Sequence, residues 1–167
     1  MFTSALVVVL FGLAEVGKSQ TPLWMTEYWS AQKAAKEQGK PLAVFLAPGN
    51  EGWNKVSQRG RLSEEALRVL AVDYACVFLD TEKKEVRDLA QAFSVSDGLG
   101  LVISNRTGEL QAFRHEGDLA DGTLLRYLKR FADPELVVQE TVTNPSVESP
   151  PPRTYFRPVF RSSMRGC

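Results

Sequence analysis

The sequence has few residues capable of sulfur or metal chemistry, with two cysteines and one histidine among 167 residues. Cys76 and Cys167 are far apart, so they form neither a Cys-x-x-Cys pair nor a zinc-binding motif. Cys76 lies inside an apolar run, which predicts a small buried hydrophobe. Cys167 is the last residue, and we expect an exposed thiol there that could form a disulfide with another chain. A disulfide framework and a metal site are both unsupported.

The net charge is zero, because 20 basic residues balance 20 acidic ones. This balance gives no indication of nucleic-acid binding. Long apolar runs are absent as well, so no integral membrane segment is expected. The run from Ala5 to Ala14 is too short to span a bilayer and is typical of a secretory signal peptide over residues 1–14. We therefore expect export to the periplasm or the extracellular space, with the mature chain beginning near Glu15.

The first four residues carry no lysine or arginine, which leaves a second interpretation of this N-terminal run. It could instead be a buried strand of a cytosolic structural subunit. N-terminal sequencing of the native protein separates the two interpretations.

What the sequence does contain is 44% apolar residues, enough for one domain with a substantial core. Apolar periodicity and turn residues predict an α/β order of α-β-α-β-α-β-β-α, with the last two strands antiparallel. The expected helices cover residues 21–38, 64–71, 84–93 and 121–131, and the expected strands cover 42–47, 76–79, 100–104 and 110–113. Phe45 and Phe78 should be buried in a sheet covered by helices on both faces.

Several segments in this order carry a resemblance to a known family. The first is the predicted strand Lys40–Ala47, which follows a helix that contains Trp29 and residues 31–37. The others are residues 93–95, 101–103 and 107–110, which precede and form the last pair of strands, and the closing helix 124–131. Together they resemble the thioredoxin-like superfamily, in its extracytoplasmic branch, over residues 22–134. The resemblance implies a three-layer sandwich around a central mixed sheet.

The sequence departs from this family at the positions that carry its chemistry. The family's Cys-x-x-Cys falls on residues 50–53, Asn-Glu-Gly-Trp, and its cis-proline falls on Leu99. Thiol–disulfide exchange needs a thiolate and a resolving thiol, which these residues cannot supply. The resemblance therefore implies a redox-inactive module for protein binding or scaffolding, with no cofactor. The alternatives are a thiol–disulfide oxidoreductase relative with degenerate activity, or an enzyme that uses Asn50, Glu51 or Asp97 in non-thiol chemistry.

The loop after the central strand supplies the first candidate contact residues, Asn50, Glu51 and Trp53. Leu99, at the cis-proline position, belongs with them. Trp53 could be exposed and contact a partner, or it could instead pack the start of the following helix against the core. Three other polar residues have structural interpretations that we prefer to catalytic ones: His115 as a surface residue at a strand end, and Asp80 and Asp97 as caps of turns.

The composition changes after Pro134, and we expect residues 135–167 to form a tail that is disordered until it binds. Three prolines, 150–152, precede arginines at every fourth position, and no acidic residue follows Glu148. The tail could dock on an unknown protein partner or on an anionic surface; alternatively it has no role. Its candidate contact residues are Arg153, Tyr155, Phe156, Arg157, Phe160 and Arg161.

Overall fold

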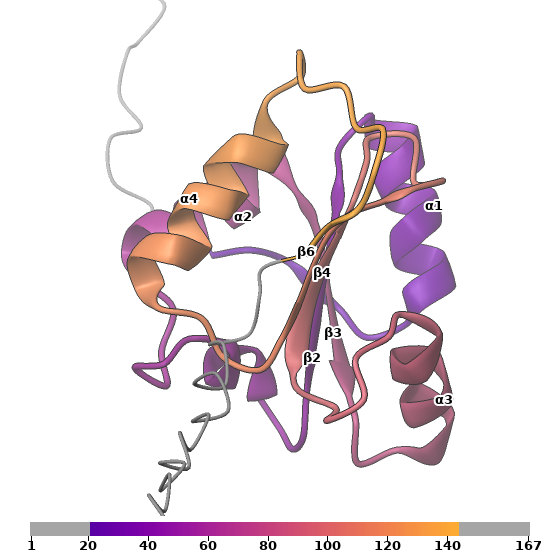
Figure 1. Cartoon of the computed structure of the whole chain (residues 1–167), viewed down its shortest axis with the longest axis vertical. Helices are drawn as coiled ribbons and strands as arrows, with labels where there is room; N and C mark the ends of the chain where they lie inside the picture. Colours follow the sequence, from indigo (N-terminus) through magenta and orange to yellow (C-terminus); the bar gives the residue numbers. More distant parts are fainter. Residues whose placement is uncertain (1–20, 144–167) are drawn as a thin grey trace, which may run out of the picture.

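Residues 21–143 are described by a computed structural model, in which a six-stranded sheet lies between two pairs of helices (Figure 1). The predicted signal peptide and residues 144–167 of the predicted tail lie outside the described residues. The strands are β1 (Trp24–Met25), β2 (Leu42–Ala47), β3 (Ala75–Asp80), β4 (Gly100–Ser104), β5 (Gln111–Glu116) and β6 (Val142–Thr143). The helices are α1 (Tyr28–Gln38), the 3-10 helix η1 (Gly52–Val56), α2 (Glu64–Asp73), α3 (Lys84–Ala92) and α4 (Asp121–Ala132).

The sheet is mixed, as predicted, with the strand order β1-β3-β2-β4-β5-β6. β2 is parallel to β3 and antiparallel to β4, β4 is antiparallel to β5, and β5 is parallel to β6. Consequently β2, β3, β5 and β6 all run in the same direction. Their carboxyl ends meet at one edge of the sheet, where α/β proteins commonly bind ligands.

The two faces of β2 show why both sides of the sheet are covered. Leu42, Val44 and Leu46 pack with residues of α1 and α3, whereas Ala43, Phe45 and Ala47 pack with residues of α2 and α4. Figure 1 shows these helix pairs on opposite sides of the sheet. All six residues of β2 are buried, so the continuous apolar run of the sequence is a two-sided central strand. The predicted three-layer arrangement is confirmed.

The first predicted helix begins later than expected. The Glu27 carboxylate accepts hydrogen bonds from the Trp29 and Ser30 backbone N–H groups, at 2.9 and 2.6 Å, and α1 follows it. Gly39 ends the helix at a φ of 63°, which glycine adopts without strain. Trp24 was assigned to the helix by its spacing, but it lies in β1 and pairs with Cys76. Pairing with the edge of β3 overrides the helical periodicity there.

Two further differences concern the end of the domain. The last helix begins at Asp121 as expected, but its N-cap is Ala120 and it ends one residue later than expected, at Ala132. The Asp121 carboxylate accepts a hydrogen bond from the Ser57 hydroxyl and pairs with Arg59 at 3.2 Å. The structure also adds strand β6 beside β5, beyond the predicted domain end at residue 134. In the described part of the chain, no helix is both long and apolar enough to cross a membrane.

Candidate functional site

The loop after β2 lies at the edge where the parallel strands end, and hydrogen bonds hold it there. The Gly49 N–H donates to Asp80 Oδ1 at 2.9 Å, and Lys55 Nζ donates to the Pro48 carbonyl at 2.8 Å. The Glu82 and Gly49 N–H groups together keep the pKa of the Asp80 carboxyl below its usual value. Asp80 therefore fastens the loop to the start of the next turn, which supports its structural interpretation.

Gly52 explains how tightly this loop packs on the sheet. A Cβ atom at this position would lie 2.9 Å from Phe78 Cζ and 3.0 Å from Ala47 Cβ. The 3-10 helix η1 therefore begins in contact with β2 and β3. This close approach brings Trp53, the next residue, over the core.

Trp53 is half-buried and belongs to an aromatic cluster. Its ring stacks on Trp24, with the centroids 5.0 Å apart and the planes at 20°, and it meets Phe78 edge-on at 5.2 Å. Trp24 in turn contacts the Phe45 ring at 5.0 Å. The structure thus supports the interpretation of Trp53 as a residue that closes the loop against the core. Trp53 also lines the groove described below.

The other predicted contact residues lie at the same edge but do not converge on one point. Asn50 and Glu51 are both exposed, and Asn50 alone of the two lines the groove. Leu99 precedes Gly100, which pairs with Leu46, so Leu99 neighbours the end of β2 and packs half-buried against the same core cluster as Trp53. Within residues 21–143 all peptide bonds are trans, including the one before Leu99. The tail residues from Arg153 to Arg161 lie outside the described residues.

A groove of about 780 Å³ opens at this edge, on the face of the sheet covered by α1 and α3. It has a size typical of ligand-binding clefts. The groove is lined by the beginning of α1, the loop after β2, the end of β3 and the first half of α3. Its lining residues are Thr26, Glu27, Tyr28, Trp29, Gly49, Asn50, Trp53, Phe78, Leu79, Asp80, Glu82, Lys83, Glu85, Val86 and Leu89.

Trp29 is a strongly exposed aromatic residue of the lining that was not among the predicted contact residues. Its side chain is 66% exposed and meets the half-buried Tyr28 ring edge-on at 5.0 Å. A sequence feature does mark it. The apolar stripe of α1 follows Tyr28, Ala31 and Ala35, and Trp29 falls beside that stripe rather than on it. An aromatic residue off the buried stripe of an amphipathic helix is available to contact another molecule.

The groove is acidic as well as aromatic. Four of its lining residues, Glu27, Asp80, Glu82 and Glu85, carry carboxylates, and Lys83 is the one basic residue in the lining. Lys55 lies close by, with its Nζ near Gly49. The arrangement favours a ligand that is both basic and partly apolar.

His115 differs from its predicted place at the surface. It lies in β5, where its side chain is 5% exposed and Nε2 is 2.9 Å from the Asp118 carbonyl oxygen. This carbonyl belongs to the segment that directly follows β5. In residues 21–143, no group of three or more histidine, cysteine, aspartate or glutamate residues is arranged to hold a metal ion.

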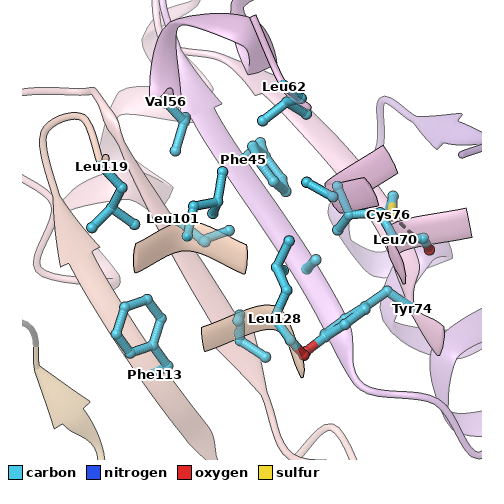
Figure 2. Packing of buried hydrophobic residues seen from close by; sticks show 14 of the residues in the cluster. Phe45, Val56, Leu62, Leu70, Tyr74, Cys76, Leu101, Phe113, Leu119 and Leu128 are labelled. Carbon is cyan, nitrogen blue, oxygen red and sulfur yellow. Dashed lines mark hydrogen bonds between the residues drawn. The ribbon is translucent and has the colours of Figure 1, made fainter. Parts of the chain in front are cut away.

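Cys76 is buried as predicted, with an exposed fraction of 2%. Its Sγ donates to the Leu70 carbonyl oxygen at 3.5 Å, on the side of the sheet covered by α2 (Figure 2). Burial raises the pKa of the thiol to about 12. The thiolate needed for nucleophilic attack is thus scarce at neutral pH, and the sulfur is out of reach of a substrate.

The comparisons with known proteins agree with this architecture. No protein-family model matches the chain, and no curated protein matches its sequence. Among solved structures, DsbH oxidoreductase is similar to it, with a TM-score of 0.54 and 16% sequence identity, over 72% of this chain and 92% of that chain. The fold is therefore thioredoxin-like. The sequence nevertheless contains no Cys-x-x-Cys pair.

Proposed function

We propose that this protein is an exported, redox-inactive member of the thioredoxin-like fold that works by binding another molecule in the groove between α1 and α3. One observation carries the proposal. Where a thioredoxin-like oxidoreductase needs two thiols, this chain has Asn50 to Trp53, and beside them lies an acidic groove with the exposed indole of Trp29. The fold is kept while the groups for thiol exchange are missing.

Geometry gives less support to an enzyme of non-thiol chemistry. Such an enzyme would need its acid and base to meet at one reacting group. Asn50 lines the groove, whereas Asp97 lines a separate hollow with Pro48 and Thr81. Glu51 is exposed and lines neither. The three residues named for that alternative therefore do not share a pocket.

The redox part of the proposal predicts that the purified protein does not reduce insulin disulfides above the rate of the reductant alone. The physical reason is that Cys76 is buried with a raised pKa and has no partner thiol in the loop. The Cys76→Ser variant is the matched control and should behave as the wild type does. Turnover that is lost in this variant would contradict the proposal and would mean that Cys76 reaches substrate.

The binding part predicts that Trp29→Ala weakens partner binding by about 2 kcal/mol, or about 30-fold in Kd, as expected for a tryptophan hot spot. Because the side chain is exposed, its removal should leave the thermal midpoint almost unchanged. Val72→Ala is the matched control, since Val72 is also exposed but lies on α2, on the opposite face of the sheet.

Affinity capture from the native compartment, followed by titration of the captured protein against each variant, measures the effect. The expected result is loss of capture by Trp29→Ala and retention by Val72→Ala. Equal binding by wild type and Trp29→Ala would place the contact surface outside this groove.

A further inference from the structure

The groove between α1 and α3 combines two recognition elements in one place. Trp29 presents an exposed indole, and Tyr28 and Trp53 add half-buried rings to the same lining. The same lining contains four carboxylates and one lysine. A matching ligand would carry several cations separated by aromatic or apolar groups, because arginine stacks on indole rings and also pairs with carboxylates.

The end of this chain has that chemistry. Arg153, Arg157, Arg161 and Arg165 are spaced by four residues, with Tyr155, Phe156 and Phe160 between them. Residues 149–167 contain no aspartate, glutamate or lysine, so the charge of the segment comes from arginine alone. The segment is thus complementary to the groove in charge and in aromatic character.

The topology brings the two together. β6 is parallel to β5, which runs in the same direction as β2 and β3. β6 ends at Thr143, which is level with Arg114, Val102 and Val44 across the sheet, so it points toward the edge where the groove opens. That edge lies three residues further along, about 10 Å at about 3.3 Å per residue. Crossing from β6 to β3 takes four steps in the strand order, about 19 Å at a strand spacing of about 4.8 Å. The ten residues from Thr143 to Arg153 can span about 33 Å when extended.

We propose that the segment Arg153–Arg161 docks in the groove of its own chain and that an external partner must displace it. This inference rests on the groove being the binding site proposed above, and it adds the regulation of that site. A short tether holds the segment at an effective concentration of about millimolar, so even weak contacts keep the groove occupied. A partner can bind only chains in which the groove is open. Its apparent Kd is therefore the intrinsic Kd divided by the fraction of open chains.

A spin label on Cys167 tests the proposal in the full chain. Cys76 is buried with a raised thiol pKa, so a thiol-directed nitroxide will react with Cys167 in the native protein. All three tryptophans lie at or behind the groove, and their indole N–H resonances report on it. We expect loss of the Trp29 indole signal through paramagnetic broadening, and an unchanged signal from the Arg68 amide on α2, on the opposite face of the sheet.

Charge variants separate docking from chance proximity. The triple substitution Arg153→Gln, Arg157→Gln and Arg161→Gln should restore the Trp29 signal, and so should 1 M salt, where the Debye length is about 3 Å. Glu82→Gln with Glu85→Gln should restore it from the groove side. The matched control is Glu64→Gln with Glu135→Gln, which removes two exposed carboxylates outside the groove and should leave the broadening in place.

A synthetic peptide with the sequence of residues 153–165 provides a second measurement. If the tethered segment fills the groove about nine-tenths of the time, the peptide should bind the triple arginine variant about tenfold more tightly than the wild type. Equal affinity for both chains without broadening would overturn self-docking, while still identifying the groove as a site for basic aromatic segments. Self-docking would also be overturned if the peptide bound neither chain and no broadening occurred. The Trp29→Ala capture experiment would then decide the proposed function separately.

Mixing isotope-labelled chains that lack the spin label with unlabelled, spin-labelled chains identifies the source of the segment. No broadening is expected in the mixture when docking occurs within one chain. Broadening in the mixture that equals the broadening within one chain would assign the segment to a second copy and overturn the proposal as stated.

Discussion

Phe45→Ala is expected to lower the free energy of unfolding by about 3–5 kcal/mol, the usual cost of removing a buried phenylalanine side chain. Phe45 is fully buried at the centre of β2, between β3 and β4. Its ring lies among Val56, Leu62 and Leu101 on the face covered by α2 and α4 (Figure 2). Trp24 also meets it edge-on. These neighbours come from separate elements that are held by the rest of the core, so they cannot collapse fully into the space left by the ring.

Denaturant unfolding of the wild type and the variant measures this effect. Because small domains are stable by about 5–15 kcal/mol, the change should be visible as a large shift of the midpoint. Phe78 is a poorer probe, since it also lines the groove. Val72→Ala, at an exposed position of α2, should change stability by no more than about 0.5 kcal/mol. A loss below about 1 kcal/mol for Phe45→Ala would contradict the central position of β2.

Gly100→Ala is expected to cost about 3 kcal/mol, at the upper end of the usual cost of overpacking. A Cβ atom at Gly100 would lie 2.4 Å from the His115 carbonyl oxygen and 3.0 Å from Val95 Cγ1. The first obstacle is backbone of β5, which is paired with β4 and cannot move away without breaking the sheet. Relief therefore requires a shift between two central strands.

Gly122→Ala provides the matched control, because it makes the same substitution where nothing lies within 4 Å of the added carbon. Gly122 is in the first turn of α4, and alanine there should be neutral or stabilising by up to about 1 kcal/mol. Thermal or denaturant unfolding of both variants should give effects of opposite sign or very different size. Equal stability of the two variants would show that β4 and β5 are not packed as closely as described.

Strands β2 to β5 could be predicted because their apolar runs are bounded by turn residues, whereas the two-residue strands β1 and β6 could not. Leu42–Ala47 and Gly100–Ser104 have their predicted limits, and α2 begins after Ser63, whose hydroxyl accepts from the Ala66 N–H at 3.2 Å. Each of these features is local, since a run of buried residues or a capping side chain lies within a few positions of what it determines. The thioredoxin-like fold followed from the order of such features.

The groove was predicted only in part. The loop after β2 was identified, and Asn50 and Trp53 do line the groove. Trp29 was not named as a candidate because the groove that it lines forms only where α1 and α3 cover the same face of the sheet, which no local pattern specifies. His115 was placed at the surface because it follows the predicted strand 110–113, whereas β5 continues to Glu116 and His115 is a buried residue within it.

The sequence by itself determined the order of the four α-helices and of strands β2 to β5, the burial of Cys76 and the lack of a thiol pair, since each depends on residue type and local pattern. The tertiary structure alone decided which side chains meet. Pairing with β3 placed Trp24 in a strand, where it stacks on Trp53, and the packing of α1 and α3 on one face of the sheet gathered Trp29 with Glu82 and Glu85 in one groove. The physical reason is that strand pairing and helix packing join residues distant in sequence, and their energies outweigh the weak local preferences that a sequence pattern records.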